Sequence, residues 1–335
     1  MKEQSYKMTA STISPIFIGG TGRSGTTILS KILSKHSEVY SFDQELRFLT
    51  DPDGLISLKH SLVDHWSFFH GDMALERFKS LMSNLKLRYV GNYPNHGLSE
   101  HTSNTFYDQW IDSYISSLIE YQSNHAWAGK VNLIQKGFLK LINPSEKPFL
   151  INKSYYCSPH TEELFIQKTQ SFMNDLYNQI SKTNKKKVIV EHTPSNLVHL
   201  DFLIKILPSL KLIHIHRDPR DIIASYKTKD WGSNDVLQNA KWIQDVLYRW
   251  ESIKKDIPNT FYLEIAFEQL IRDPEKEIRR ICKYINIPFE KSLLNIDLSK
   301  HNIGRWENCF SESEKNKLNA QFAKLITKNG INEIY

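Results

Sequence analysis

The hydrophobic positions of this 335-residue chain follow two alternating patterns. Short apolar runs, which predict buried strands, occur at 15–20, 187–191, 210–214 and 261–265. Apolar residues at helical spacing lie between them at 26–37, 195–207, 218–227 and 236–256. Strands that alternate with helices are typical of a parallel sheet covered on both faces. The pattern therefore predicts an α/β fold, with a P-loop-like parallel sheet flanked by helices.

The stretch from about 51 to 186 has a different pattern. Helical spacing recurs at 72–87 and 106–120, between loops and many aromatic residues. We interpret this stretch as a mostly helical insertion within a single domain that spans 1–335. Its aromatic residues are candidates for the wall of an acceptor pocket, although aromatics in such numbers more often form a core. These candidates are Trp66, Phe68, Phe69, Tyr93, Tyr107, Trp110, Tyr155 and Tyr156.

Composition and charge narrow the function classes. Hydrophobic residues make up 40% and charged residues 24%, which argues against a disordered chain or a coiled coil. The net charge of +6 favours an anionic ligand, but the basic residues are dispersed, so we predict no nucleic-acid partner. No apolar run is long enough for a signal peptide or a membrane span, and the three cysteines are widely spaced. We therefore expect a cytoplasmic protein with no membrane partner, and the sequence predicts no oligomeric state.

A glycine-rich loop follows the first predicted strand. Gly20 and Gly25 keep the spacing of an ATP-type phosphate loop, and Thr27 keeps its hydroxyl. The position of the usual lysine holds Thr26, and the only cation is Arg23, within the loop. The loop precedes a helix whose N-terminal N–H groups attract anions. It therefore predicts a phosphate site without a triphosphate clamp, formed by Gly22, Arg23, Ser24, Gly25, Thr26 and Thr27.

A second candidate clamp follows the third predicted strand. Arg217 leaves this strand, and Ser225 comes eight residues later, about two turns along the next helix. An arginine and a hydroxyl together can bind a phosphate. The alternative is that Arg217 simply pairs with Asp218 at the start of the helix. Because ligands of parallel sheets bind beyond the carboxyl ends of the strands, we expect the loops after Gly19, Glu191 and His216 to converge.

Together the two clamps resemble those of the sulfotransferase family. The loop at 20–27 is similar to the family's site for the 5′-phosphosulfate of 3′-phosphoadenosine 5′-phosphosulfate (PAPS), and 217–225 is similar to its 3′-phosphate site. The segments 266–289 and 301–306 resemble the family's late strand and helix and its C-terminal cofactor loop. The resemblance implies further cofactor contacts from Lys229, Phe267, Arg305 and Trp306, with Trp306 bracing Arg305. Phe267 stands where relatives often carry tyrosine, and Lys229 where they often carry arginine.

The segments 36–39 and 44–47 resemble the bacterial members related to tyrosylprotein sulfotransferases. This resemblance implies that Glu45 is the general base and that Arg47 assists it. A carboxylate needs partial burial or a poised acceptor to act as a base near neutral pH. His192 is the competing candidate, because cytosolic sulfotransferases carry a catalytic histidine at this place. It could act as a base or, when protonated, as a cation on the leaving group.

These features imply transfer of a sulfuryl group from PAPS to a hydroxyl or amine of a small-molecule, carbohydrate or peptide acceptor, with PAP as the product. Arg23 would stabilise charge on the leaving phosphate, and no metal is required. One alternative is a P-loop small-molecule or nucleotide kinase, which Thr26 in the lysine position disfavours. Another is a non-catalytic PAP-binding protein. The sequence does not identify the acceptor.

Overall fold

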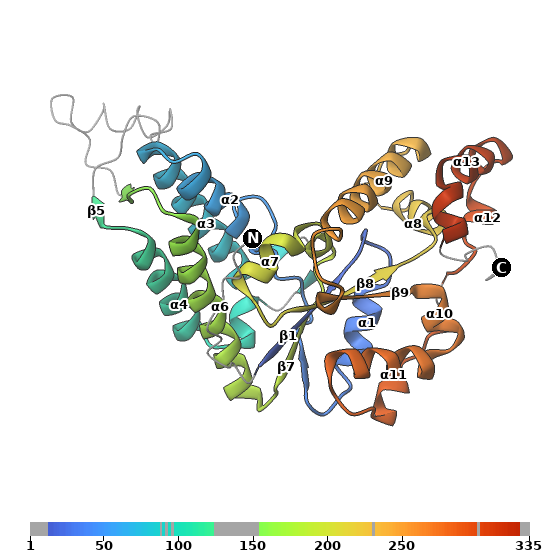
Figure 1. Cartoon of the computed structure of the whole chain (residues 1–335), viewed down its shortest axis with the longest axis horizontal. Helices are drawn as coiled ribbons and strands as arrows, with labels where there is room; N and C mark the ends of the chain where they lie inside the picture. The colour runs from blue at the N-terminus through green and yellow to red at the C-terminus, as the bar shows by residue number, and fades with distance from the viewer. Residues whose placement is uncertain are drawn as a thin grey trace. The chain divides into compact units, whose positions relative to one another are not determined.

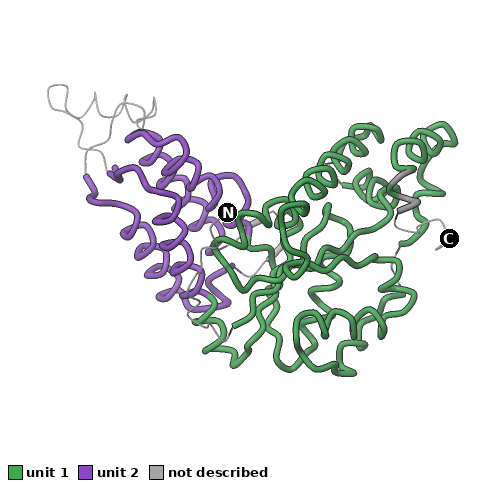
Figure 2. The backbone as a smooth tube through the Cα atoms, viewed as in Figure 1, with its two compact units in different colours: residues 1–46, 177–335 green, residues 47–176 purple. Residues whose placement is uncertain are grey.

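The computed structural model describes residues 13–87, 89–90, 93–94, 97–123, 154–229, 232–299 and 302–328. The chain divides into two compact units, shown in Figure 2. Unit 1 comprises Met1–Leu46 and Tyr177–Tyr335, and unit 2 comprises Arg47–Leu176. Every residue that the sequence implies for the nucleotide site belongs to unit 1.

The sheet of unit 1 has five parallel strands in the order β2-β7-β1-β8-β9 (Figure 1). They are β1 (Ser14–Gly19), β2 (Val39–Ser41), β7 (Val188–Glu191), β8 (Lys211–His216) and β9 (Tyr262–Ala266). The four strands that the apolar runs predict are all present, and the parallel sheet is confirmed. β2 was not predicted, because three residues at the edge of a sheet are too few to give a periodic signal.

Helices cover this sheet and bury alternate strand residues. One apolar cluster joins Ile16, Ile18, Val190 and Ile213 to α1, α10 and α11, and a second joins α8, α9, α12 and α13. Residues two apart on a strand point to the same face, which explains the first cluster. The helical elements are α1 (Thr26–Leu33), η4 (Pro194–His199), α7 (Leu200–Ile206), α8 (Pro219–Tyr226), α9 (Val236–Ile253), η5 (Asn259–Phe261), α10 (Phe267–Arg272), α11 (Pro274–Ile285), η6 (Lys291–Leu294), α12 (Trp306–Cys309) and α13 (Glu312–Lys328).

Unit 2 is mostly helical in its described residues. Its elements are α2 (Leu55–Lys59), η1 (His60–Asp64), α3 (Phe68–Leu87), β3 (Tyr89–Val90), β4 (Tyr93–Pro94), η2 (Leu98–His101), α4 (Asn104–Leu118), β5 (Tyr121–Ser123) and β6 (Ser154–Tyr156). Helix α6 (Glu162–Asn184) begins in unit 2 and ends in unit 1. The helices predicted at 72–87 and 106–120 correspond to α3 and α4.

Several of the aromatic residues proposed for a pocket wall form the core of unit 2. Trp110 stacks on Phe172 with ring centroids 4.1 Å apart and donates its indole N–H to the Phe172 carbonyl oxygen. Tyr107 is buried and donates its hydroxyl to the Met82 carbonyl oxygen. Tyr155 is buried as well. For these three residues the structural role is the correct one. Across the described ranges, no helix is both long and apolar enough to cross a membrane.

Candidate active site

The glycine-rich loop between β1 and α1 has a backbone that only glycine adopts easily. Gly22 and Gly25 have φ angles of 76° and 111°, in the left-handed region. A Cβ atom on Gly25 would also lie 2.6 Å from the ring of Phe267. Gly25 is the residue just before α1, so the first N–H groups of this helix face the loop. The loop thus packs closely against the Phe267 ring and lies at the N-terminal N–H groups of α1.

Contacts from two neighbouring segments hold this loop. The Gly20 N–H group donates to the Pro194 carbonyl oxygen at 3.1 Å, which joins the loop to the segment after β7. The Tyr226 hydroxyl donates to the Thr21 carbonyl oxygen, which joins the loop to the end of α8. The loops after β1, β7 and β8 therefore meet at the carboxyl edge of the sheet, as the strand pattern predicts.

A cavity of about 330 Å³ opens in unit 1 at this edge. Three arginines and three hydroxyl side chains line it, together with one carboxylate, so its wall is strongly cationic. Guanidinium and hydroxyl groups are the usual ligands of phosphate oxygens. The lining residues are Arg23, Gly25, Thr26, Thr27, Ile28, Arg217, Asp221, Ser225, Asn302 and Arg305.

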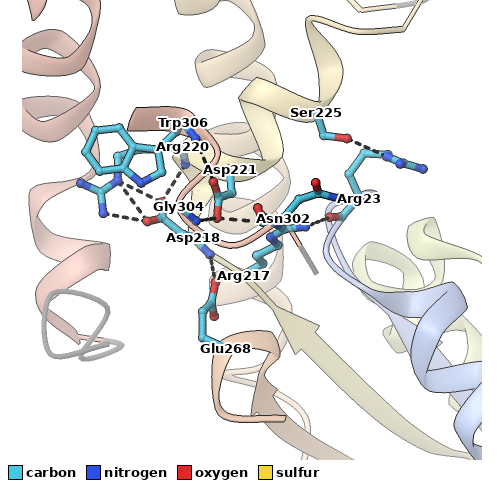
Figure 3. A network of polar contacts seen from close by, with 10 residues as sticks. All are labelled: Arg23, Arg217, Asp218, Arg220, Asp221, Ser225, Glu268, Asn302, Gly304 and Trp306. Carbon is cyan, nitrogen blue, oxygen red and sulfur yellow. Dashed lines mark hydrogen bonds and ion pairs between the residues drawn. The ribbon is translucent and has the colours of Figure 1, made fainter. Parts of the chain in front are cut away.

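The two predicted phosphate clamps lie together in this cavity. Arg23 donates from Nε to the Ser225 hydroxyl at 3.0 Å, although 202 positions separate them in the chain. Arg217 donates to the Arg23 carbonyl oxygen at 3.5 Å. Figure 3 shows the Ser225 hydroxyl on α8 pointing at the Arg23 side chain. Segments that the sequence could relate only by analogy are therefore neighbours in space.

Arg217 is held by an aromatic ring and by hydrogen bonds. Its guanidinium lies over the Phe267 ring, 4.7 Å from the ring centroid. It donates to the Asn302 carbonyl oxygen at 2.6 Å and to the Asp221 carboxylate at 3.4 Å. Phe267 has no exposed surface and lies outside the cavity lining. It therefore supports Arg217 and Gly25, and its contact with a cofactor stays a prediction.

Asp221 fastens the loop that carries Arg305. Its carboxylate accepts the N–H groups of Gly304 and Trp306 at 2.9 Å and 3.1 Å. Burial is the main cause that raises the pKa of Asp221, and the Arg217 guanidinium opposes this shift. Figure 3 shows the carboxylate between α8 and the backbone of this loop. The cavity thus receives Arg305 through a loop that Asp221 and Arg217 hold.

Trp306 has a different partner from the one that the sequence suggested. We expected it to brace Arg305, but its ring covers Arg220, with the guanidinium carbon 3.9 Å from the ring centroid. Arg220 in turn pairs with Asp218 at 2.7 Å, and Asp218 caps the start of α8. The sequence offered a pair between Asp218 and Arg217 as an alternative, but Asp218 pairs with Arg220. Trp306 stabilises the neighbouring ion pair and lies outside the cavity lining.

Three more predicted residues lie outside the cavity lining. Ser24 is fully buried, and its hydroxyl is packed so closely to Gly20 that a Cβ there would lie 2.2 Å from it. Lys229 is exposed just after α8. Arg47 belongs to unit 2 and pairs with Asp51 at 2.5 Å. The segment 301–306 resembles the family's cofactor loop, but His301 lies outside the described residues.

The two candidates for the general base lie at the ends of neighbouring strands. β2 and β7 run parallel with Ser41 beside Val190, so the segments that follow the two strands leave the sheet at the same edge. Glu45 follows β2 and is half-buried, and His192 follows β7 and is only 4% exposed. Burial lowers the pKa of His192 to about 4, against opposition from Asp43. Burial thus favours the neutral form of His192, which is the form that can accept a proton.

Glu191 is a buried carboxylate between these two candidates, and the sequence reasoning missed it. It has no exposed surface at the end of β7. It accepts the N–H groups of Leu46 at 2.9 Å and Thr193 at 2.8 Å. Burial raises its pKa to about 7, and the charge of Glu45 adds to this shift. The available signal was an acidic residue ending the apolar run 188–190, because a buried carboxylate requires partners.

The strand order arranges these groups in a line along the carboxyl edge. β2 and β7 bring Glu45 and His192, β1 in the centre brings the loop with Arg23, and β8 brings Arg217. The base candidates thus lie on the β7 side of the glycine-rich loop, and Arg217 lies on its β8 side. Fold and site together define an α/β protein of the class that binds a phosphorylated ligand at the carboxyl edge of its sheet.

Comparison with known proteins identifies the family. The sulfotransferase family model matches residues 15–291, and the chain belongs to this family. The sulfotransferase domain of the olefin synthase from Synechococcus PCC 7002 has the same fold, with a TM-score of 0.51 at 18% identity over 96% of this chain and 98% of that chain. The parallel sheet flanked by helices is therefore a sulfotransferase fold.

Two curated relatives match parts of the chain. A putative protein-tyrosine sulfotransferase from Caenorhabditis elegans is 22% identical over 190 residues, which cover 47% of this chain and 70% of that protein. An uncharacterized protein from Aquifex aeolicus (strain VF5) is 25% identical over 114 residues, 32% of this chain and 15% of that protein. The chain therefore matches only a small part of the length of the second relative.

Proposed function

We propose that this protein transfers a sulfuryl group from PAPS to a hydroxyl or amine of a small-molecule, carbohydrate or peptide acceptor. The observation that carries the proposal is the single cavity that joins Arg23 of the glycine-rich loop to Arg217 and Ser225. A ligand with two separated phosphate groups fits a cavity with two clamps better than a triphosphate does. Family membership supports the same donor.

The residues present fit this donor. The 5′-phosphosulfate would lie against Arg23 and the first N–H groups of α1, where the partial positive charge of the helix favours an anion. The 3′-phosphate would lie against Arg217, Ser225 and Arg305. The cavity wall therefore carries enough positive charge for both groups of PAPS and for the product PAP.

The reaction is an in-line displacement at sulfur. The acceptor oxygen or nitrogen bonds to sulfur while the bond between sulfur and the bridging phosphate oxygen breaks, and its electron pair stays on the phosphate. Arg23 stabilises the charge that develops there, a contribution worth about 10²- to 10³-fold in kcat for one such donor. Glu45 or His192 accepts the proton of the acceptor.

The two base candidates differ in how readily they can act near neutral pH. His192 is neutral there, but its pKa of about 4 makes it a weak base. Glu45 is half-buried, and it lies in the segment that resembles the one carrying the base in the bacterial relatives. We therefore propose Glu45 as the general base and Arg23 as the group that stabilises the leaving phosphate.

The test begins with binding and ends with transfer. Isothermal calorimetry with PAP and with ATP should give micromolar or tighter binding of PAP and much weaker binding of ATP. Transfer of ³⁵S from labelled PAPS is then measured with a phenol, a sugar, an amine and a tyrosine-containing peptide. Tight binding of ATP without binding of PAP would favour a kinase, and PAP binding without any transfer would favour a non-catalytic binding protein.

A further inference from the structure

The Glu191 carboxylate holds both segments that carry a base candidate. One carboxylate oxygen accepts the Leu46 N–H group at 2.9 Å and the Thr193 N–H group at 2.8 Å, and also the Thr193 hydroxyl. The other oxygen accepts the side-chain amide of Asn196. Leu46 directly follows Glu45. A single buried side chain therefore connects the segment after β2 to the turn after β7.

These contacts restrict the positions of the candidates themselves. Leu46 is fully buried and its N–H group is bound, so the peptide that follows Glu45 has one position. Thr193 is 2% exposed, and both its N–H group and its hydroxyl are bound to the same carboxylate, which fixes the peptide that follows His192. A displacement of about 1 Å in such a group can cost about 10²-fold in rate.

We propose that Glu191 is a positioning residue for the proton-accepting side of the reaction, which sets Glu45 and His192 through the backbone next to each. This inference rests on the proposed function. Glu191 itself is not among the residues that line the cavity. It acts through Leu46 and Thr193, and it belongs to the same edge of the sheet as the glycine-rich loop.

The charge of Glu191 has a second effect, on proton affinity. Glu45 and Tyr177 are the titratable groups that interact electrostatically with it. All of its hydrogen-bond partners are donors and favour the ionised form, while burial raises its pKa to about 7. When ionised, it makes protonation of any nearby base more favourable. Glu191 therefore tunes the base as well as placing it.

Glu191→Gln separates charge from geometry. The substitution keeps the size of the side chain, and the new amide group can donate to the side-chain Oδ1 of Asn196, which is buried without a hydrogen-bond partner. For this contact the side-chain amide of Asn196 needs only to exchange the positions of its oxygen and nitrogen atoms. We expect kcat above pH 7, where Glu191 is ionised, to fall about tenfold, with the affinity for PAP changing less than twofold, and the difference from wild type to narrow below pH 7, where the Glu191 carboxyl is itself protonated.

Glu191→Ala removes the hydrogen bonds of the side chain as well as its charge. We expect kcat to fall about 100-fold or more, with the affinity for PAP again nearly unchanged. Glu277→Gln is the matched control, because Glu277 is also a buried carboxylate of unit 1, paired with Arg280 on α11. If Glu191→Gln changes kcat and its pH dependence no more than Glu277→Gln does, Glu191 serves stability alone and the proposal is wrong.

Amide hydrogen exchange tests the proposal without any turnover. In Glu191→Ala, exchange at Leu46 and Thr193 should accelerate at least tenfold, while the amides of the glycine-rich loop keep their wild-type rates. Unchanged exchange at both positions would overturn the positioning role even in an active enzyme. Conversely, accelerated exchange in a protein whose wild type transfers no sulfuryl group would contradict the proposed function and leave the contacts of Glu191 established.

Discussion

The two sides of the glycine-rich loop differ in where their ionisable side chains lie, in a cavity wall on one side and in the protein interior on the other. On the β8 side, Arg23, Arg217 and Arg305 line an open cavity and present guanidinium groups to a ligand. On the β7 side, Glu191 and His192 are buried, and the backbone binds the carboxylate. Exposed cations supply binding energy to an anion, whereas buried groups shift their proton affinity. One edge of one sheet thus separates a cavity lined by cations from a set of buried titratable groups.

A similar difference separates Arg217, which lines the cavity, from Arg220, which is buried. Arg220 is 4% exposed and bonds to Asp218 and Asn319, with Trp306 over its guanidinium. Arg217 lines the cavity, and its contacts include backbone carbonyl oxygens, which a phosphate oxygen can replace. Arg220 has a close carboxylate partner and stabilises the fold, whereas Arg217 pairs with Asp221 at the longer distance of 3.4 Å and lines the cavity.

The largest expected effect concerns the proton-accepting side. Glu45→Gln should lower kcat by about 10²- to 10⁴-fold, because it removes a general base without changing the shape of the side chain. The affinity for PAP should stay nearly constant, since Glu45 is not among the residues that line the cavity. Single-turnover transfer of ³⁵S and calorimetry with PAP measure the two quantities.

His192→Asn is the comparison that can reverse this assignment. We expect a smaller loss of kcat, because His192 is only 4% exposed. If His192→Asn costs more turnover than Glu45→Gln, the base is His192. Glu275→Gln, an exposed change on α11, controls for the loss of a carboxylate elsewhere in unit 1.

The next effect concerns the donor side. Arg217→Ala should weaken PAP binding by about 10- to 100-fold, the value of one or two charge-assisted hydrogen bonds. Arg249→Ala is the matched control, because Arg249 is 54% exposed on α9 and pairs only loosely with Asp201 at 3.4 Å. Equal PAP affinity in the two variants would refute the assignment of Arg217 to the 3′-phosphate.

Much of the fold could be predicted from the sequence, because its signals are local. The four longer strands appear as apolar runs, and Gly22 and Gly25 mark a loop whose φ angles require glycine. β2 could not be predicted, because three residues give no period. The segment 195–207 also carried no sign that it divides into the 3₁₀ turn η4 and the helix α7.

The site was less predictable, because its details depend on contacts between distant segments. Arg23 and Arg217 could be picked out by residue type, but the bond from Arg23 to Ser225 could not. The true partner of Trp306 depends on Arg220, which looked like an ordinary charged residue of a helix. Glu191 was missed for the same reason, since its partner Leu46 lies 145 positions away.

A third prediction uses the opposite pKa shifts of the proton-accepting side. Burial lowers the pKa of His192 from 6.5 to about 4 and raises that of Glu191 from 4.5 to about 7. As the pH falls from 7 to 5, the unfolded chain takes up a proton at His192 that the folded chain does not, which destabilises the fold. Over the same interval folded Glu191 takes up a proton that the unfolded chain does not, which stabilises it.

The two contributions oppose each other in the wild type, and single substitutions separate them. Relative to wild type, His192→Asn should gain about 2 kcal/mol in the free energy of unfolding between pH 7 and pH 5, and Glu191→Gln should lose a similar amount. Urea unfolding at pH 5, 6 and 7 measures these differences. Identical pH dependence in all three proteins would mean that neither group titrates differently in the folded state.

The smallest expected effect tests the hydroxyl of the donor side. Ser225→Ala removes the partner of Arg23 Nε and one neutral hydrogen bond to a phosphate, worth about 0.5–1.5 kcal/mol, so PAP affinity should fall about two- to tenfold. Turnover should fall by no more than this, because Arg23 keeps its charge. Ser34→Ala, at an exposed hydroxyl after α1, is the control. A loss in kcat that exceeds the loss in affinity would instead mean that Ser225 orients Arg23 toward the leaving phosphate, and would join the donor clamp to the chemistry.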